Sequence, residues 1–484
     1  MLNKPEKSKQ KIKKVFKFGG SCLRDSSSFR QAIRLIKAEQ PERVAVVVSA
    51  VQGVTDLLLD AYHKALGQDK NYKGTIQYVK QKHLTLAAEL LSLKRFGKAS
   101  ELFSQIFSQL DRLLQGITLV GDSTPGLKAR ILSSGERLSA WLLGLTMEEA
   151  GLTSRVYETD RIGLIVDQPG EGVSVNLKKF DKNFASVSEE IAGGSFIPVF
   201  TGYFGCTENG QVALFGRNGS DYSAAIIARG LRAEILITFK DVSGFLSADP
   251  EIVPQATTIP YLDRKEAAEL AYFGSRVLHP KTLEPVSDRR LILEIRSFQR
   301  PEKPGTVIQE KTAKNTSMIK SFALNQNISI LRIEGPGVGH KPGIIGLIGS
   351  RLAEKNINIL TVLTSQTCIN LILDKSAAEL ACRVIKELNE TSIKNLSVEH
   401  DLALIACVGF GLRETPGVAG KIFSVMSREK INLEFFSSGA SEVAIYLIVK
   451  KDEAVKAVKA LHREYFTSTR ETEKNKPEYT ELNC

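Results

Sequence analysis

The sequence predicts a three-layer α/β sandwich with a mainly parallel central sheet, followed by two smaller α+β units. Two observations lead to this prediction. Apolar, β-branched runs alternate with helical segments over about the first 300 residues, and a Pro-Gly pattern then occurs twice near the C-terminus. A chain of 484 residues is too long for a single core. We expect domains at 13–310, 311–397 and 398–467, with disordered tails at 1–12 and 468–484.

The N-terminal region consists of expected strands that end in turns and lead into helices. Val15–Phe18 runs into Gly19-Gly20 and a helix to about Glu39, and Val44–Ser49 is typical of a strand buried on both faces. The later elements expected are helices at 76–117 and 136–150, strands at 155–158, 196–201 and 235–239, and a hairpin at 203–215 around Asn209-Gly210. In such a fold, ligands bind at the carboxyl ends of the parallel strands.

The C-terminal region contains an internal repeat. Pro342-Gly-Ile-Ile-Gly346 precedes a helix and then Ile357-Asn-Ile359, and Pro416-Gly-Val-Ala-Gly420 precedes a helix and then Ile431-Asn-Leu433. Each copy continues into an alternating strand, at 368–373 and 443–448. Matched Pro, Gly and Asn positions with the same element order predict two related βαββ units.

Composition excludes several classes of protein. The net charge of +11 is spread along the chain, without a basic stripe interleaved with aromatics, so we expect no nucleic-acid partner. The six cysteines contain no C-x-x-C pair, which fits a reducing compartment and argues against a zinc site. No apolar run reaches the length of a membrane span or a signal peptide, so we expect no membrane partner and a cytoplasmic location.

The segment Phe215–Ala228 is the most informative for function. Its glycines allow close backbone approach to a ligand, and Arg217 can hold a carboxylate or phosphate bidentately. Asp221 is acidic at a place that suits anions, so we expect it to orient a cation. The alternative is an ordinary connection in which Ser220 or Asp221 caps the helix.

Lys17 lies on the first strand, directly before a glycine turn. Phe16 and Phe18 flank it and imply a buried strand, where an unpaired ammonium would be costly. A lysine there, with the backbone donors of Gly19 and Gly20, suits phosphate oxygens better than a structural role. The pattern is neither a Walker loop nor a G-x-G-x-x-G fingerprint.

Weaker signals lie at other strand ends. Ser49–Thr55 and Ser133–Ser139 offer hydroxyls, backbone donors and Glu136, although a turn or helix dipole explains each in isolation. Phe239–Gly244 is well placed for a nucleotide base and ribose. His279, directly before a proline, is interpreted as a packed structural residue.

Together these segments resemble the aspartokinase family, in order and over about residues 13–465. The motifs are Lys17-Phe-Gly-Gly-Ser21, 49–55, Ser134-Gly-Glu-Arg137, Gly216-Arg-Asn-Gly-Ser-Asp-Tyr-Ser-Ala224, Lys240-Asp-Val-Ser-Gly244, Ala248-Asp-Pro250 and 269–280. The repeat resembles tandem ACT domains, each βαββαβ, which bind amino-acid effectors in that family. The fold implied is the amino-acid-kinase sandwich followed by two regulatory units.

The resemblance implies ATP-dependent phosphorylation of the side-chain carboxylate of L-aspartate to 4-phospho-L-aspartate. This reaction begins the biosynthesis of lysine, threonine, methionine and diaminopimelate. ATP with Mg²⁺ is the implied cofactor, and an effector such as lysine or threonine would bind at the ACT units. A homodimer through those units is implied as well. The length leaves no room for a fused homoserine dehydrogenase, so a monofunctional enzyme is expected.

The resemblance also implies roles for individual residues. Lys17 would stabilise the transferring phosphoryl group, and Asp221 would position that lysine. The implied substrate-binding residues are Thr55, Glu136 (for the α-ammonium), Arg217 (for a carboxylate), Asn218, Gly219 and Ser220. The implied ATP-binding residues are Lys17, Gly19, Gly20, Ser21, Lys240, Asp241, Leu246, Arg276 and Val277. The implied effector-binding residues are Val338, Gly343, Ile345, Asn358, Thr364 and Ser365.

Two departures from the family pattern bear on the expected ligands. The family often has Tyr, Arg and Lys at the nucleotide end, where this chain has Leu246, Glu251 and Arg276. Lysine-sensitive members have an Asp and a Glu where Leu360 and Gln366 stand here. Two alternatives therefore stay open: a kinase for another acid or a nucleotide, such as glutamate or UMP, and an inactive amino-acid-binding regulator.

Overall fold

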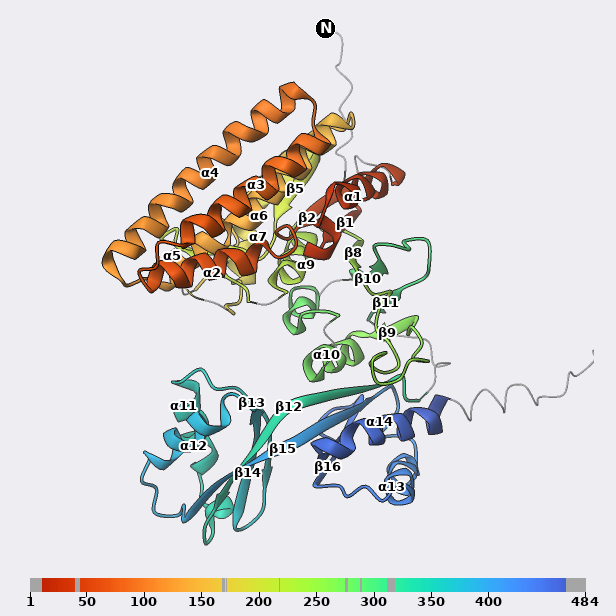
Figure 1. The fold of residues 1–484 in the computed structure, drawn as a ribbon. Helices are drawn as coiled ribbons and strands as arrows, with labels where there is room; N and C mark the ends of the chain where they lie inside the picture. Colours follow the sequence, from red (N-terminus) through yellow and green to blue (C-terminus); the bar gives the residue numbers. More distant parts are fainter. Residues whose placement is uncertain are drawn as a thin grey trace, which may run out of the picture. The chain divides into compact units, whose positions relative to one another are not determined.

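A computed structural model describes residues 11–39, 44–167, 170, 172–216, 218–274, 277–287, 290–310 and 318–466 (Figure 1). Their contacts divide them into two compact units. The first unit comprises the described residues of Met1–Phe245, Thr258–Arg264 and Arg276–Thr312. The second comprises those of Leu246–Thr257, Lys265–Ser275 and Ala313–Cys484. No helix in the described ranges is both long and apolar enough to cross a lipid bilayer.

An eight-stranded sheet forms the centre of the first unit. Its strand order is β3-β5-β2-β1-β8-β10-β11-β9, and every neighbouring pair is parallel except β10 with β11. The strands are β1 Lys14–Phe18, β2 Val44–Val48, β3 Ser154–Tyr157, β5 Ile197–Thr201, β8 Ile235–Lys240, β9 Tyr261–Asp263, β10 Ile292–Ser297 and β11 Thr306–Gln309. The predicted parallel sheet is confirmed.

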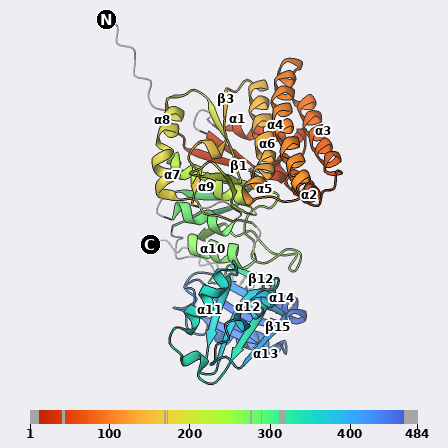
Figure 2. The same ribbon diagram turned by 90° about the vertical axis from the view of Figure 1, so that its left-hand side faces the viewer.

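Helices cover both faces of this sheet, which gives the expected three layers (Figure 2). One layer contains α1 Ser26–Ala38, α2 Val54–Leu66, α3 Tyr72–Leu90, α4 Leu93–Val120, α5 Pro125–Leu132 and α6 Ser134–Glu149. The opposite layer contains α7 Leu177–Asn183, α8 Ala185–Gly193 and α9 Gly219–Gly230. Helix α9 packs on β1, β2 and β8, while α6 packs on β2, β3 and β5.

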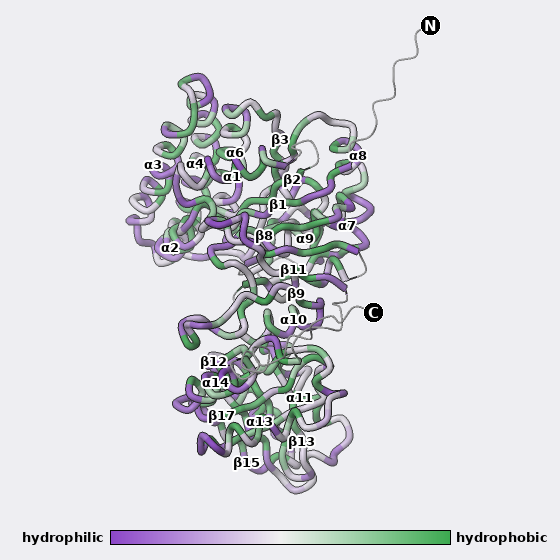
Figure 3. The backbone as a smooth tube through the Cα atoms, turned by 90° about the vertical axis from the view of Figure 1, so that its right-hand side faces the viewer, coloured by the Kyte–Doolittle hydropathy of each residue, from purple (hydrophilic) through white to green (hydrophobic). Residues whose placement is uncertain are grey.

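Burial explains the strand sequences. All five residues of β2 are buried, as expected for a parallel strand covered on both faces. Phe16 and Phe18 join a large core with α1–α4 and α6, and Phe18 stacks on Phe239 with ring centroids 5.2 Å apart. Figure 3 shows β1 and β8 as mainly hydrophobic, whereas the outer helices alternate in hydropathy. Because side chains alternate along a strand, Lys17 points to the opposite face, toward α9.

The helical region expected at 76–117 is two helices and not one. Leu91 adopts an extended conformation after α3, and Ser92 precedes α4 in an extended conformation as well. The expected hairpin is confirmed: β6 Phe204–Thr207 pairs antiparallel with β7 Val212–Leu214, and β6 also pairs with β4 Ile165–Val166. The remaining helical elements of this region are the 3-10 turns η1 Gly20–Leu23, η3 Thr159–Arg161 and η4 Pro280–Val286.

The second unit contains a six-stranded antiparallel sheet in the order β13-β14-β12-β15-β17-β16. Its strands are β12 Ser321–Glu334, β13 Ile359–Thr364, β14 Cys368–Asp374, β15 Asn395–Val408, β16 Phe435–Ser438 and β17 Ala444–Lys450. Its helices are α10 Arg264–Phe273 (from Lys265 on), η5 Val338–His340, α11 Ile344–Ala353, α12 Ala378–Lys386, α13 Val418–Arg428 and α14 Lys451–Phe466.

The internal repeat maps onto this sheet. Helices α11 and α13 each begin after a glycine in the left-handed region, Gly343 at φ 83° and Gly417 at φ 88°. Strands β12 and β15 run through both halves, with an irregularity near Asn325–Ile328. A hydrophobic core of this unit includes Phe322 on β12 and also Ala248, which lies far upstream of β12 in the sequence. The linear boundaries at 310 and 397 remain predictions.

Candidate active site

Two lysines and one aspartate meet where β1 and β8 end. Lys17 Nζ lies 2.6 Å from Asp221 Oδ1, and Lys240 Nζ lies 2.8 Å from Asp221 Oδ2. The side chains of Lys17, Lys240 and Asp221 are 4%, 12% and 0% exposed, respectively. Strands β1 and β8 are parallel neighbours, and α9 brings Asp221 to them in its first turn. The cluster carries one net positive charge when all three groups are ionised.

Electrostatics reinforce this arrangement. Burial alone would raise the pKa of Asp221, but the two ammonium groups outweigh it, so the pKa is lowered and the carboxylate stays ionised. Burial lowers the pKa of Lys17, and the attraction of Asp221 only partly offsets this effect. Repulsion from the Lys240 ammonium lowers the pKa of Lys17 further. Asp221 therefore holds together two cations that would otherwise repel each other.

The glycine turn after β1 approaches these groups closely. A Cβ atom on Gly19 would lie 3.4 Å from Lys17 Nζ, and one on Gly20 would lie 3.2 Å from the carbonyl oxygen of Ala50. Gly19 also accepts a hydrogen bond from the backbone N–H of Cys22, which closes the turn, with Ser21 between them. The turn therefore leaves little room for side chains beside the lysine.

Glu136 lies at the neighbouring strand end, in the first turn of α6. Its Oε1 accepts a hydrogen bond of 3.0 Å from the backbone N–H of Ala50, directly beyond β2. Its Oε2 is buried and has no hydrogen-bond partner among the described residues. Burial raises the pKa of Glu136 to about 8, against the opposing effects of the Ala50 N–H and of Lys17. A buried carboxyl group with one unused oxygen suits a cationic ligand.

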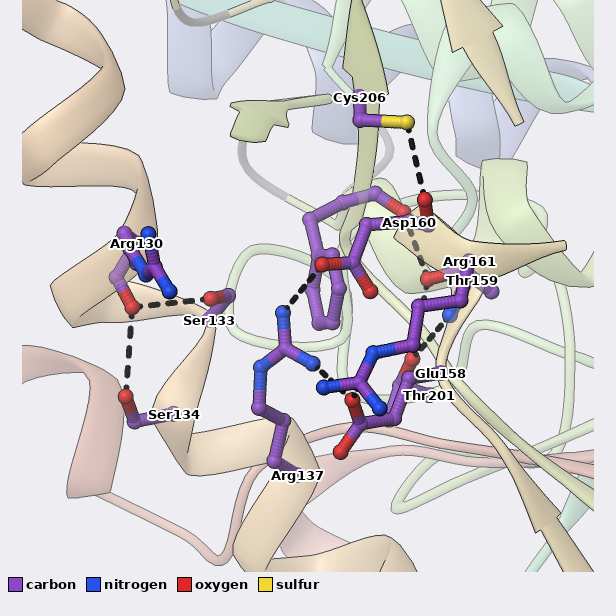
Figure 4. A network of polar contacts seen from close by, with 11 residues as sticks. Arg130, Ser133, Ser134, Arg137, Glu158, Thr159, Asp160, Arg161, Thr201 and Cys206 are labelled. Carbon is purple, nitrogen blue, oxygen red and sulfur yellow. Dashed lines mark hydrogen bonds and ion pairs between the residues drawn. The ribbon is translucent and has the colours of Figure 1, made fainter. Parts of the chain in front are cut away.

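A network of ion pairs fixes the start of α6 (Figure 4). Arg137 pairs with both Glu158 and Asp160, at 2.7 Å to Asp160 Oδ2, and its guanidinium lies 4.7 Å from the centre of the Phe204 ring. Thr159 donates to the carbonyl oxygen of Phe204 at 2.8 Å. The network thus ties the residue after Glu136 to the segment that follows β3.

The segment 49–55 contacts the first turns of α6. Ser139 Oγ donates to the carbonyl oxygen of Ser49 at 2.6 Å, and a Cβ atom on Gly135 would lie 2.8 Å from Ala50 Cβ. Thr55 is half-buried near the start of α2, which begins after Gly53 at φ 80°. The structure thus brings the segments 19–20, 49–55 and 135–139 to one edge of the sheet.

The segment 215–228 forms the start of α9. Gly216 has φ 84°, and Asn218, at φ 57°, is the N-cap residue without a side-chain cap. The alternative in which Ser220 or Asp221 caps the helix is therefore wrong. A Cβ atom on Gly219 would lie 2.8 Å from Phe215 Cβ, and Ser220 is buried. Arg217 lies outside the described residues.

The expected nucleotide residues are only partly brought together. Lys240, expected near the base and ribose, instead pairs with Asp221, while Asp241 is exposed directly after β8. Leu246 belongs to the second unit, Val277 is half-buried in the first, and Arg276 lies outside the described residues.

Sequence reasoning missed the pairing of Lys240 and the network of Arg137. A signal for the first was available: Lys240 lies an even number of residues from Thr238, which pairs in register with Lys17. His279 is half-buried and accepts a hydrogen bond from the backbone N–H of Lys281, which supports its structural interpretation.

The expected effector residues surround one end of the first repeat. Val338 is fully buried in η5, Gly343 is the N-cap residue of α11, and Ile345 is 46% exposed on that helix. A Cβ atom on Gly339 would lie 1.7 Å from the carbonyl oxygen of Ser365, so η5 touches the turn after Thr364. Asn358, in the same unit, donates to the hydroxyl of Tyr272 at 3.1 Å.

Comparison with known proteins identifies relatives of both regions. Residues 13–296 match the model of the amino acid kinase family, and residues 405–465 match that of an ACT domain. Aspartokinase 3, chloroplastic, of Arabidopsis thaliana is 31% identical over 96% of this chain and 83% of its own length. A bifunctional aspartokinase/homoserine dehydrogenase 2, chloroplastic, of the same plant is 28% identical over 94% of this chain. The chain spans about half (51%) of that bifunctional relative.

Solved structures share the fold. The structure of E. coli aspartokinase III in complex with aspartate and ADP (R-state) has a TM-score of 0.82 and 25% identity, covering 94% of this chain and all of that one. The same enzyme in complex with lysine and aspartate (T-state) has a TM-score of 0.74 with 24% identity and the same coverage, which shows the fold alone.

Proposed function

The chain belongs to the aspartokinases, within the amino acid kinase family, and from this membership we propose that it phosphorylates L-aspartate. ATP and L-aspartate give ADP and 4-phospho-L-aspartate. The product would enter the biosynthesis of lysine, threonine, methionine and diaminopimelate. The observation that carries the proposal is the Lys17–Asp221–Lys240 cluster beside a buried glutamate with an unused oxygen.

The cluster suits the charge problem of this reaction. A side-chain carboxylate oxygen attacks the γ-phosphorus, and the bond from that phosphorus to the oxygen of the departing ADP breaks. The nucleophile is already an anion, so no general base is required, and catalysis consists of alignment and neutralisation of charge. Lys17 stabilises the transferring phosphoryl group. Lys240 adds a second ammonium, and Asp221 holds both in position without meeting the substrate.

The acceptor site supplies the complementary contacts. The unused Oε2 of Glu136 binds the α-ammonium of aspartate, which pulls the pKa of Glu136 down and keeps it ionised in the complex. Arg217 pairs with a carboxylate of the substrate, as the family resemblance implies. Thr55 and residues 218–220 complete the pocket.

ATP enters with Mg²⁺ and lies over the glycine turn at residues 19–21. The complex of E. coli aspartokinase III with aspartate and ADP supports this donor. Within the described ranges, no three His, Cys, Asp or Glu side chains are grouped to hold a metal ion. Mg²⁺ would enter with ATP, held by phosphate oxygens and water, and would supply neutralisation of phosphate charge.

Regulation follows from the second unit. An amino-acid effector would bind around residues 338–345 and 358–365, and the match of residues 405–465 to the model of an ACT domain supports a regulatory unit of this type. We further propose a homodimer through the two ACT-like regions, in a cytoplasmic setting. Edge strands β13 and β16 are the sheet edges open to pairing.

A substrate comparison tests this function. Purified protein is incubated with MgATP and L-aspartate, L-glutamate, UMP or no acceptor, and ADP is quantified. We expect ADP release with L-aspartate only. Equal release with glutamate or UMP would assign the alternative kinase activity, and none with any acceptor would favour the inactive regulator.

A further inference from the structure

Helix α3 contacts the segment between β2 and α2 through a lysine. Lys82 Nζ donates a hydrogen bond of 2.8 Å to the backbone carbonyl oxygen of Gln52. Lys82 is half-buried, and the next residue, His83, is fully buried against Phe103 and Phe107 of α4. Helix α3 also packs on α2 and α6 (Figure 1). The backbone of α3 is therefore fixed at this point, so that the lysine can hold a loop in position.

The segment that Lys82 contacts is also held at two other backbone groups. Ser139 Oγ donates to the carbonyl oxygen of Ser49 at 2.6 Å, and the N–H of Ala50 donates to Glu136 Oε1 at 3.0 Å. Both of these partners lie on α6, whereas Lys82 comes from α3 and holds the other end of the segment. Three side chains from two helices thus fix a short stretch of backbone beside the buried glutamate.

Ala50 and Gln52 also lie against the glycine turn that follows β1. A Cβ atom on Gly20 would lie 3.2 Å from the carbonyl oxygen of Ala50 and 3.6 Å from the Cα atom of Gln52. That turn is closed by its own hydrogen bond, from the N–H of Cys22 to the carbonyl oxygen of Gly19. A displaced segment would therefore move its N–H away from the glutamate on α6, while the turn keeps its shape.

We propose that Lys82 is a positioning residue for the phosphorylation of aspartate. By holding the carbonyl oxygen of Gln52, it keeps the N–H of Ala50 on one oxygen of Glu136 and leaves the other oxygen in place for the α-ammonium of the substrate. Lys82 itself does not contact a substrate. The proposal rests on the proposed function and adds a residue on α3, a helix that contains none of the motifs described above. A single hydrogen bond from an ammonium to a carbonyl contributes modestly, so its loss should weaken aspartate binding without abolishing turnover.

Steady-state kinetics of the full-length chain test this role. Lys82→Met removes the ammonium and keeps the aliphatic stem, Lys82→Arg keeps a donor, and Lys73→Met removes an exposed cation from the same helix. We expect the KM for aspartate to rise about fivefold in Lys82→Met and to stay at the wild-type value in Lys73→Met. The KM for ATP should change less than about twofold, and Lys82→Arg should recover part of the loss.

Salt distinguishes a lost contact from a lost attraction for the anionic substrate. The ratio of the KM values of Lys82→Met and wild type should remain in about 0.5 M KCl, where attraction over a long distance is screened. An unchanged KM for aspartate in Lys82→Met, or a rise that salt abolishes, would overturn the proposal.

The pH profile distinguishes positioning from general loosening. Burial raises the pKa of Glu136, and the N–H of Ala50, Lys17 on β1 and Arg137 on α6 each oppose this effect. Lys82→Met leaves both charges in place and weakens only the contact with the N–H, so the pKa of Glu136 should rise further. The fall of the KM for aspartate with increasing pH should therefore occur at higher pH in Lys82→Met than in wild type. A profile that does not move would contradict the positioning role.

Hydrogen exchange tests the contact without the reaction. In mass spectrometry of peptides that cover residues 49–55, we expect faster exchange in Lys82→Met than in wild type or Lys73→Met. Equal exchange would show that Lys82 does not hold the segment. A wild type that forms no 4-phospho-L-aspartate would overturn the proposed function itself, whereas an active wild type with an equally active Lys82→Met would overturn only the role of Lys82.

Discussion

Lys240 Nζ lies 2.8 Å from Asp221 Oδ2, on a buried carboxylate whose other oxygen lies 2.6 Å from Lys17. Two strands and one helix thus place two ammonium groups on a single anion. Because the net charge of the cluster is positive, it can attract a phosphoryl group without leaving a buried cation unpaired. In the proposed function, catalysis and local stability depend on the same three side chains, and single variants distinguish the two roles.

Replacement of Lys17 should remove activity with little cost to folding. In Lys17→Met, Asp221 keeps its ion pair with Lys240, so no buried charge loses its only partner. We expect turnover to fall at least about 1000-fold, because a preorganised charge at the reacting group is lost. Thermal unfolding should shift by only a few degrees. Retained turnover would remove Lys17 from the mechanism.

Replacement of Asp221 should instead destabilise the fold. Asp221→Asn leaves two ammonium groups facing each other in a buried site, whereas Lys17→Met leaves a matched pair. Breaking a buried ion pair from one side costs about 3 kcal/mol or more. Urea denaturation of both variants measures the difference. Equal stability of the two would show that Asp221 does not hold the cations.

Glu136 should make stability depend on pH. Burial raises its pKa from the ordinary value of 4.5 to about 8, so between these two pH values the folded state binds a proton that the unfolded state has lost. Stability therefore falls as the pH rises from 4.5 to 8. At pH 8, urea denaturation should therefore give Glu136→Gln a free energy of unfolding more than about 1 kcal/mol above that of wild type. At pH 4 the variant should show no such gain.

The same variant should lose affinity for aspartate, because an amide cannot neutralise an ammonium. In wild type the KM for aspartate should fall as pH rises from 7 to 8.5, while Glu136→Gln should show no such dependence. Glu101→Gln, an exposed position on α4, serves as the control. A pH-independent KM in wild type would contradict the role of Glu136.

Arg137 should act through the position of its neighbour. Arg137→Leu leaves Glu158 and Asp160 without this guanidinium and loosens the first turn of α6. We expect the KM for aspartate to rise about tenfold, as expected when a charged hydrogen-bonding group is lost, with the KM for ATP nearly unchanged. Arg137→Lys should recover part of the effect. A parallel rise in both constants would indicate general destabilisation instead.

The close approach at Gly339 should matter for the effector response. Gly339→Ala forces η5 away from the turn at Ser365, whereas a Cβ atom on Gly346 would meet nothing within 4 Å. Lysine and threonine are titrated into the kinase assay of each variant. We expect a weakened response in Gly339→Ala and a normal one in Gly346→Ala, with similar kcat in the absence of effector. Equal responses would place the effector elsewhere.

Much of the first unit could be predicted because its signals are local. The β-branched run at Val44–Val48 predicts a buried strand, and Asn209-Gly210 predicts a hairpin turn. Both elements are observed. The break between α3 and α4 was missed because Leu91 and Ser92 carry no Gly or Pro. The expectation that Asp221 orients a cation is met by its ion pair with Lys17, whereas the phosphate site beside Lys17 stays a prediction.

Other features depend on contacts between distant segments. Lys240 turns toward Asp221 only because β8 pairs with β1, and Ala248 joins a core built mainly by residues after 318. A hollow lined by Asp241, Arg300 and Lys303 has no motif, since it arises where the ends of β8 and β10 meet. A local sequence pattern does not show which strands become neighbours, because this depends on the order of the strands in the sheet.

Acyl-phosphate formation on aspartate at the cluster of two lysines is measured directly by chemical trapping. Wild-type protein is incubated with MgATP, L-aspartate and hydroxylamine, which traps an acyl phosphate as a hydroxamate, beside Lys17→Met of equal folded content. We predict aspartyl hydroxamate in an amount equal to the ADP released from wild type, and none from the variant. ADP release without hydroxamate, or equal hydroxamate from the variant, would contradict the account.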